Sequence, residues 1–328
     1  MIKQNNSFQE IWDFLKSCDK VAMTLHYGPD GDSLGSCTAL KYVLEKEGIK
    51  VDLVSGDALS GNLNDLDFKK SVDFSRDVSD LNEEDYDCFI FLDCGSAGTI
   101  SGKKRAEYKF PKKVKIVNID HHDANSFYGD FNYIDASRSS VCSLLVDFFR
   151  EVGIEFNKEL GKRLMVGLCT DNGFFNHPKD PEDDFEKALF LIRIGVDYMR
   201  EIALPILFSD SLEMKKLYAL VLNNLEVDKK NRIGWSTVSF DEMKNLKLNR
   251  AEVRLGIQVI QNIKDIDVVF FLVELEDHIK GSLRSKGRDT SIVAKHFRGG
   301  GHKMASGFSL DKMPLSEAVK KIRDELTK

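Results

Sequence analysis

The stretch Lys115-Ile116-Val117-Asn118-Ile119-Asp120-His121-His122 decides how the first half of the chain folds. Its apolar, β-branched beginning is typical of a strand buried inside a sheet, and it stops abruptly in a carboxylate and two imidazoles. Open α/β sheets bind their ligands at the carboxyl edge of the strands. The stretch therefore predicts a strand that delivers functional side chains to that edge.

Other carboxylate and imidazole side chains also stand at the ends of apolar segments in this half of the chain. They are His26, Asp30 and Asp32 after the apolar run 21–25, Asp93 after the run 89–92, and Asp171 after a helix predicted over 160–169. Strands and helices alternate throughout the region, which predicts an α/β fold with a doubly wound, mostly parallel sheet covered on both sides. Such a sheet would bring these side chains together at one edge.

The length of 328 residues predicts two domains, because it exceeds the size of a comfortable single core. We assign residues 1–184 to a catalytic domain, 185–211 to a helical connector, and 212–328 to a smaller α/β domain. In that second domain the pattern predicts strands near 233–238, 268–275 and 279–284, and helices over 251–263, 291–297 and from Leu315.

The bulk composition excludes several classes of protein. The longest apolar run, 268–273, is far shorter than the ~20 residues that cross a bilayer, and the N-terminal residues lack a signal-peptide core. We therefore expect a cytoplasmic protein without a membrane partner. The six Cys residues form no Cys-x-x-Cys pair and predict no disulfide framework. A net charge of -6 argues against binding to long duplex nucleic acid, and the sequence leaves a homodimer open.

Five Asp and three His side chains at one edge would repel one another strongly unless they were neutralised. Two divalent cations would resolve this repulsion, and the mixture of carboxylates and imidazoles favours Mn²⁺, with Mg²⁺ or Co²⁺ as alternatives. A cation pair activates water and offsets charge on phosphoryl oxygens. The reaction that these residues predict is phosphoester hydrolysis.

In their order and approximate spacing, these residues resemble the four motifs of the DHH phosphoesterase superfamily. The motifs are His26-x3-Asp30-x-Asp32, Asp93, Asp120-His121-His122 and Asp171. Near the C-terminus, Gly299-Gly300-Gly301-His302-Lys303-Met304-Ala305-Ser306-Gly307 resembles the signature of the DHHA1 substrate-binding domain. Length and layout are most similar to the NrnA-like oligoribonucleases and pAp phosphatases.

The resemblance implies a role for each residue of the first domain. His26, Asp30 and Asp93 would hold one cation, while Asp32, Asp93, His121 and Asp171 would hold the second, with Asp93 as the bridge. Asp120 would orient His121 without touching metal. His122 would face the scissile phosphate as a hydrogen-bond donor or acid.

The second domain carries a local basic field, because seven Lys or Arg residues and one acid lie between Lys280 and Lys303. Such a field fits a short phosphate-bearing ligand, and glycines let backbone N–H groups approach an anion closely. The resemblance implies that the substrate's far end is held by Arg284, Ser285, Gly299, Gly300, Gly301 and His302.

The activity implied is Mn²⁺-dependent hydrolysis of short oligoribonucleotides to mononucleotides, together with conversion of pAp to AMP. Two alternatives stay open: a phosphodiesterase for cyclic dinucleotides or pApA, and a metal-free nucleotide-binding module. Asn172 departs from the Thr that related proteins commonly carry, and the segment Phe174 to Pro178 is unusual. The effect of this loop on substrate choice cannot be predicted from the sequence.

Overall fold

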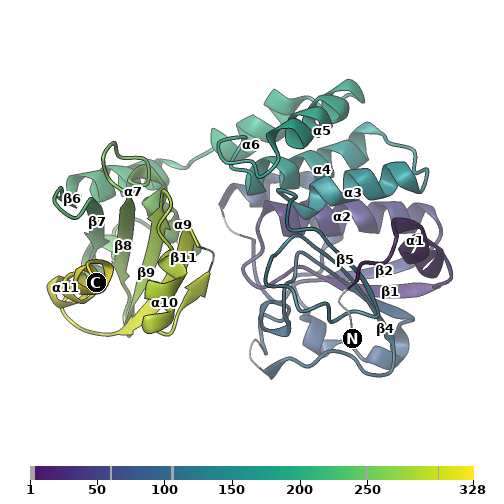
Figure 1. Ribbon diagram of the computed structural model, residues 1–328, viewed down its shortest axis with the longest axis horizontal. Helices are drawn as coiled ribbons and strands as arrows, with labels where there is room; N and C mark the ends of the chain where they lie inside the picture. Colours follow the sequence, from purple (N-terminus) through teal and green to yellow (C-terminus); the bar gives the residue numbers. More distant parts are fainter. Residues whose placement is uncertain (1–3, 60, 105–106, 249, 302) are drawn as a thin grey trace. The chain divides into compact units, whose positions relative to one another are not determined.

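The chain forms two compact units, one ending at Ser209 and the other beginning at Asp210 (Figure 1). The structure is a computed structural model, and it describes residues 4–59, 61–104, 107–248, 250–301 and 303–328. Much of the segment 185–211, assigned above to a connector, belongs to the first unit. Leu191 and Ile202, for example, are fully buried in the core of that unit.

The first unit is built on a five-stranded sheet in the order β2-β1-β3-β4-β5, in which every neighbouring pair is parallel. The strands are β1 (Lys20–Thr24), β2 (Lys50–Val54), β3 (Cys88–Leu92), β4 (Lys115–Asp120) and β5 (Phe131–Ile134). The strand order reverses between β1 and β3, which creates a switch point at their carboxyl ends. The predicted α/β fold with a parallel sheet is confirmed. The sequence pattern does not predict β5, because a four-residue edge strand shows little periodicity.

Helices cover one face of this sheet. They are α1 (Phe8–Lys16), α2 (Gly31–Lys46), α3 (Val141–Glu151), α4 (Lys158–Asp171) and α5 (Pro181–Arg193). Figure 1 shows α2, α3 and α4 side by side over the sheet, with α5 lying on α4. Polar side chains begin several of these helices: Asp30 accepts the N–H of Ser33, and Ser140 accepts that of Ser143.

The other face of the sheet carries short 3₁₀ turns and loops. These turns are η3 (Val78–Asp80), η4 (Glu83–Asp85) and η5 (Ala97–Thr99), whereas η1 (Gly61–Asp65) and η2 (Asp67–Ser71) bury Leu63 and Phe68 in the core on the helix side. Alternation along β3 divides the two cores, since Cys88, Ile90 and Leu92 face the helices whereas Phe89 and Phe91 face the loops. Being buried on both faces explains why β3 reads as an unbroken apolar run.

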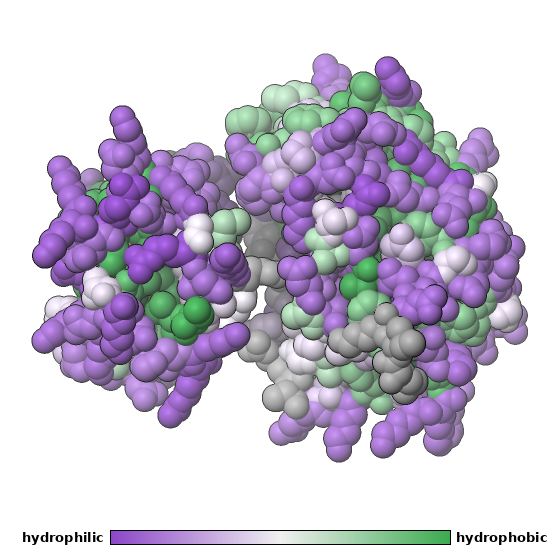
Figure 2. Space-filling view, viewed as in Figure 1, coloured by the Kyte–Doolittle hydropathy of each residue, from purple (hydrophilic) through white to green (hydrophobic). Residues whose placement is uncertain are grey.

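After α5 the first unit ends in a π-helical turn, η7 (Tyr198–Ala203), and the short helix α6 (Leu204–Leu207). Apolar side chains stay exposed here, and Figure 2 shows green colour gathering at the surface over α5 and α6. The exposed apolar residues of these two helices are Phe185, Leu189, Ile192, Leu204 and Leu207. Among the described residues, no helix combines the length and apolar character that a membrane span requires.

The second unit is a six-stranded mixed sheet in the order β10-β11-β9-β8-β7-β6. Its strands are β6 (Glu226–Asp228), β7 (Ile233–Val238), β8 (Val268–Glu274), β9 (His278–Ser285), β10 (Gly300–Gly301) and β11 (Ala305–Asp311). Of these described strands, only β7 and β8 pair in parallel. Val268, Phe270 and Leu272 face one core of this unit, while the residues that alternate with them along β8 face the other.

Helices pack on both faces of the second sheet. They are α7 (Leu212–Asn223), α8 (Phe240–Lys244), α9 (Arg250–Arg254), α10 (Thr290–His296) and α11 (Leu315–Leu326), with the 3₁₀ turn η8 (Leu255–Val259). The helix predicted over 251–263 is therefore too long, because α9 ends at Arg254. Gly256 in η8 lies so close to the Phe271 ring that a Cβ there would be 3.0 Å from it. This tight packing against β8 accompanies the change from α to 3₁₀ geometry.

Replacing Gly35 by Ala should destabilise the first unit. A Cβ at Gly35 in α2 would lie 2.5 Å from the carbonyl oxygen of Arg163 in α4, so the two helices must move apart. We expect the free energy of unfolding to fall by about 1–3 kcal/mol. Urea denaturation followed by circular dichroism measures this loss. Gly98→Ala is the matched control, because its Cβ would meet nothing closer than 3.9 Å. Equal midpoints for the two variants would contradict the packing argument.

Candidate metal centre

The switch point of the first sheet gathers the acidic and imidazole side chains singled out in the sequence. His26 follows β1, Asp93 follows β3, His121 follows β4, and Asp171 is the last residue of α4. Three groups have ligand atoms within 4.8 Å of one another: His26 with Asp30 and Asp93, Asp32 with His121 and Asp171, and Asp93 with His121 and His122. Of the eight side chains predicted for this domain, seven belong to at least one of these groups, and Asp120 belongs to none.

Asp93 occupies the middle of the cluster. Its two carboxylate oxygens lie 3.3 Å from Nε2 of His26 and 3.4 Å from Nε2 of His121. The residue is buried, and its Oδ1 has no hydrogen-bond partner among the described residues. A buried carboxylate oxygen without a donor is costly, and a cation removes that cost. Asp93 belongs to two of the ligand groups, and its Oδ1 makes no hydrogen bond to a described residue although two imidazole nitrogens lie 3.4 and 3.6 Å from it; this arrangement fits a pair of divalent cations.

The backbone at Asp93 is also strained. Its φ of 57° is left-handed, a conformation that costs a non-glycine residue about 1–3 kcal/mol. Such strain persists where the surroundings fix it, and here the Asp93 N–H donates to the carbonyl of Ile119 at the end of β4. The left-handed turn aims the carboxylate across the edge of the sheet, toward both imidazoles.

Asp32 is held by the beginning of α3. Its Oδ2 accepts the N–H of Val141 at 2.6 Å and its Oδ1 accepts that of Cys142 at 2.9 Å. The positive end of the helix dipole stabilises a carboxylate at this place. Gly167 of α4 makes room, since a Cβ there would collide with Asp32 Oδ1. The ligand is thus fixed by backbone groups that are distant in the sequence.

A backbone carbonyl orients the ring of His121. Nδ1 of this ring lies 3.2 Å from the carbonyl oxygen of Arg138, so Nδ1–H is the donor, and Nε2 is the nitrogen that could bind a cation once it has lost its proton. Nε2 then faces Asp171 Oδ2 at 3.2 Å as well as Asp93. A carbonyl has no signature in sequence, which explains why sequence reasoning could not find this partner.

Asp120 orients a different histidine from the one expected. Its Oδ1 lies 2.7 Å from Nδ1 of His122. From His121, the same oxygen accepts the backbone N–H, at 2.8 Å, and not the ring. Its Oδ2 accepts from Asn125 Nδ2 at 2.6 Å. The carboxylate turns back on the residues that follow it, so the ring it reaches is that of His122. Asn125 is a partner that the sequence analysis missed.

The electrostatics of the cluster depend on burial and on neighbouring charges. Burial opposes the charged form of His121, but hydrogen bonding with Asp93 and the charges of Asp93, Asp171 and Asp32 raise its pKa to about 10. Burial raises the pKa of Asp32 to about 7 and that of Asp171 well above its usual value. For Asp93, burial opposes ionisation, but His121 and His26 hold its pKa well below the usual range.

The residues predicted to bind substrate in the second unit lie mainly on β9 and β10, which are separated in the sheet by β11. Arg284 pairs with Ala305 across β9 and β11, and Gly301 pairs with Ser306 across β10 and β11. Burial lowers the pKa of Arg284, whose Nη1 donates to the carbonyl of Leu283 at 2.9 Å. Ser285 Oγ donates to the carbonyl of Arg288. Binding by these residues remains a prediction.

Two of the predicted glycines have a packing role. A Cβ at Gly299 would lie 2.7 Å from Cα of Phe308, and Gly301 has a φ of 133°, which favours glycine. These constraints explain the glycines without a ligand. A Cβ at Gly300 would meet nothing within 4 Å, so no neighbouring atom covers this side of the β10 backbone. His302 lies outside the described residues.

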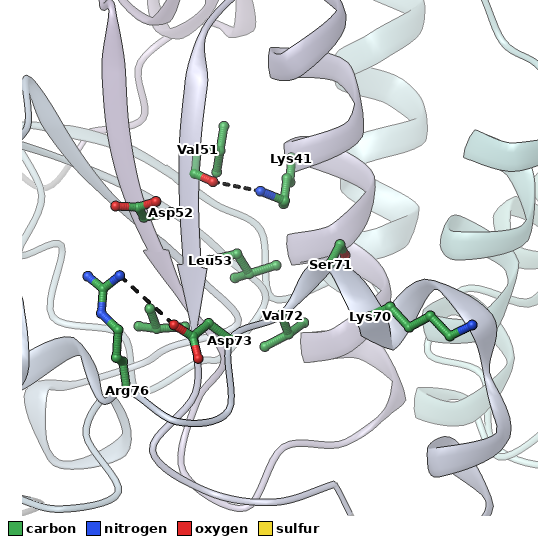
Figure 3. A pocket seen from close by; sticks show the side chains of 10 residues that line it. Lys41, Val51, Asp52, Leu53, Lys70, Ser71, Val72, Asp73 and Arg76 are labelled. Carbon is green, nitrogen blue, oxygen red and sulfur yellow. Dashed lines mark hydrogen bonds and ion pairs between the residues drawn. The ribbon is translucent and has the colours of Figure 1, made fainter.

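A pocket of about 250 Å³ lies at the other edge of the first sheet, beside β2 (Figure 3). Its wall includes Lys41, Asp52, Asp73 and Arg76. Lys41 Nζ donates to the carbonyl of Val51 at 2.6 Å, and Arg76 pairs with Asp73 at 3.9 Å. Asp52 pairs instead with Lys20, which does not line the pocket. The pocket contains none of the predicted site residues.

Comparison with known proteins agrees with this architecture. The N-terminal domain of the DHH family matches residues 20–168, and the DHHA1 domain matches residues 237–328. The chain belongs to the DHH family. The resemblance predicted from the motifs, and the enzyme class of phosphoester hydrolases that goes with it, are thereby confirmed.

Curated relatives align over nearly the whole chain. A protein of Streptococcus mutans, described as a probable bifunctional oligoribonuclease and PAP phosphatase NrnA, is 28% identical over 92% of this chain and 93% of its own length. The NrnA of Bacillus subtilis is 25% identical over 89% of this chain and 90% of its own. Among solved structures, an exopolyphosphatase-related protein from Bacteroides fragilis has a TM-score of 0.89 at 21% identity, covering 97% of this chain and 94% of that one. That structural likeness supports the fold alone.

Metal binding at this cluster should release protons and strengthen as the pH rises. The pKa of His121 is raised to about 10 and that of Asp32 to about 7, so near neutral pH a cation must displace their protons. We expect the affinity for Mn²⁺ to increase between about pH 6 and about pH 8, about tenfold per unit for each proton released. Calorimetry in buffers of different ionisation enthalpy counts these protons. An affinity independent of pH would contradict the assignment.

Replacing Asp120 by Asn should lower the pKa of His122. Burial opposes the charge on this ring, and the hydrogen bond and charge of Asp120 raise its pKa above the ordinary value. The variant keeps the side-chain shape and removes that charge. We expect NMR titration of the metal-free protein to show the shift, and kcat to fall about tenfold or more. Asp123→Asn changes an exposed neighbour and should move neither quantity; equal effects of both variants would contradict the role of Asp120.

Proposed function

We propose that this protein is a Mn²⁺-dependent phosphoesterase that hydrolyses short oligoribonucleotides to mononucleotides and converts pAp to AMP. The observation that carries the proposal is the buried carboxylate of Asp93, whose Oδ1 makes no hydrogen bond among the described residues and which belongs to two groups of side chains that could hold a metal ion. The names of the relatives from Streptococcus mutans and Bacillus subtilis supply the substrate class.

The donor set agrees with two cations. His26, Asp30 and Asp93 would hold one, and Asp32, Asp93, His121 and Asp171 would hold the other. When bound, such a pair supplies Lewis acidity and an activated water for attack on phosphorus. The chain itself would fix each ligand in advance: α3 holds Asp32, the Arg138 carbonyl holds His121, and the strained turn holds Asp93.

His122 is the residue proposed to contact the substrate phosphate. Its Nδ1 faces Asp120, which raises the pKa of the ring. A protonated imidazole can donate to a phosphoryl oxygen, or supply a proton to the leaving group. Asp120 would keep the ring in the orientation and protonation state required for that role.

The second unit is proposed to bind the far end of the substrate. Arg284 suits a phosphate group, since its guanidinium is planar and presents two parallel donors. The open backbone at Gly300 would add N–H groups for an anion. Six free cysteines, all buried, support the cytoplasmic location proposed for such an activity.

The test is a product-resolved assay of the full chain with Mn²⁺. The substrates are RNA dinucleotides to decanucleotides, pAp, pApA and cyclic di-AMP, each with and without a chelator. We expect mononucleotides from the shortest RNAs and AMP from pAp, and we expect the chelator to abolish both. Absence of mononucleotide from dinucleotides to pentanucleotides would overturn the proposal. A higher kcat/KM on pApA or cyclic di-AMP would favour the cyclic dinucleotide alternative.

Asp93→Asn tests the site within the same assay. The change removes the central charge at nearly constant volume, so we expect hydrolysis to fall by a factor of about 10³ or more, while the fold is retained. Asp13→Asn, an exposed acid on α1, is the control and should keep full activity. Retained turnover in Asp93→Asn would place the chemistry elsewhere. Nucleotide binding without turnover by the unchanged protein would instead favour the binding module.

A further inference from the structure

Asn172 links the end of α4 to α5 and closes the turn between them. The residue directly follows Asp171 and is fully buried. Its Nδ2 donates to Oδ2 of Asp184 at 3.0 Å, and its Oδ1 accepts the N–H of Phe175 at 2.8 Å. One side chain thus ties the turn that follows the predicted metal ligand Asp171 to α5.

The turn that Asn172 closes is strained. Three consecutive residues are left-handed, with φ of 62° at Gly173, 54° at Phe174 and 66° at Phe175. Bulky residues rarely adopt this conformation, and it persists only where neighbouring groups impose it. The hydrogen bond from Phe175 to Asn172 is one such restraint. Another is the stacking of the Phe175 ring on Phe185, with centroids 4.8 Å apart. Backbone hydrogen bonds of the turn, such as that from the Phe174 N–H to the carbonyl of Cys169, add to these restraints.

The acceptor for Asn172 lies on a firmly held helix. Asp184 is fully buried in the first turn of α5. Three residues further along α5, the buried Lys187 donates to Asp147 Oδ2 at 2.6 Å and to Ser143 Oγ at 2.8 Å, both on α3. The same helix α3 holds Asp32 by its first N–H groups. A rigid path therefore connects Asn172 with the part of the fold that fixes another ligand.

We propose that Asn172 is a positioning residue for the metal site, and that its hydrogen bond with Asp184 aims Asp171 at His121 and Asp32. The inference rests on the proposed function, because it assumes that this cluster binds cations. Asp171 Oδ2 lies 3.2 Å from His121 Nε2, and Asp171 is the one ligand of that group carried by the last turn of a helix. Loosening the turn would let this carboxylate swing away from the other ligands.

A purely structural role makes a different prediction. Asn172 also ends α4, since its backbone N–H donates to the carbonyl of Thr170. If capping were its whole contribution, a change of side chain would lower the melting temperature and leave the affinity for a cation unchanged. Metal affinity therefore separates the two roles.

The experiment exchanges the two partners. Asn172→Asp sets two carboxylates against each other and removes the amide donor. The double variant Asn172→Asp with Asp184→Asn restores a donor and acceptor in the reverse direction. We measure Mn²⁺ affinity by calorimetry on the metal-stripped full chain, and kcat and KM on a dinucleotide. We expect the single variant to bind Mn²⁺ about tenfold more weakly or worse, and the exchange to return the affinity to near that of the unchanged protein.

Asn132→Asp is the matched control. Asn132 is a buried asparagine of the same unit whose amide bonds with Gly129, so its replacement should lower stability and leave Mn²⁺ affinity unchanged. If Asn172→Asp fails to fold, Asp184→Ala takes its place, because it removes the acceptor without adding charge. The same weakening is expected there.

The outcomes distinguish this inference from the proposed function. Unchanged Mn²⁺ affinity in Asn172→Asp, or in Asp184→Ala where that is used, overturns the positioning role. Weakened affinity that the exchange does not restore overturns the hydrogen bond as its cause. If the unchanged protein binds Mn²⁺ but hydrolyses none of the substrates, the proposed function fails while the affinity measurements still decide the inference.

Discussion

The candidate metal centre is organised around one charge, the buried carboxylate of Asp93, whose Oδ1 makes no hydrogen bond in the described part of the chain. Three imidazoles approach this carboxylate, that of His26 at Oδ2 and those of His121 and His122 at Oδ1, and the backbone beneath it adopts a left-handed conformation that a non-glycine residue normally avoids. Neither feature favours stability by itself. The oxygen without a hydrogen bond and the left-handed backbone are both explained if the protein sacrifices some folding free energy to place a negative charge where a cation would bind.

The ligands around Asp93 are fixed mostly by backbone groups. N–H groups at the beginning of α3 hold Asp32, and a loop carbonyl at Arg138 holds His121. Such partners depend on the fold rather than on particular side chains. They also keep their orientation at little entropic cost, because ordered backbone has no rotamers to lose on binding. The helices and the edge of the sheet therefore make the site rigid.

The sequence predicted the sheet, the order of its motifs and the residues that meet at its edge, because each motif ends an apolar run of recognisable period. It could not predict which ring Asp120 would reach, since the choice between His121 and His122 depends on backbone geometry after β4. Nor could it locate the Arg138 carbonyl, which has no signature. The helix expected over 251–263 fails for a packing reason, the close approach of Gly256 to Phe271. Short elements such as β5 and β10 carry too little periodicity to be seen.

All six cysteines lie in the first unit, and all are buried as free thiols. Burial raises the pKa of each, for Cys18 to about 11, so the nucleophilic thiolate is scarce in the folded state. An alkylating reagent must then wait for the first unit to open before it reacts. The second unit carries no cysteine and contributes nothing to the signal. The rate of thiol labelling thus reports the opening of the first unit separately from that of the second.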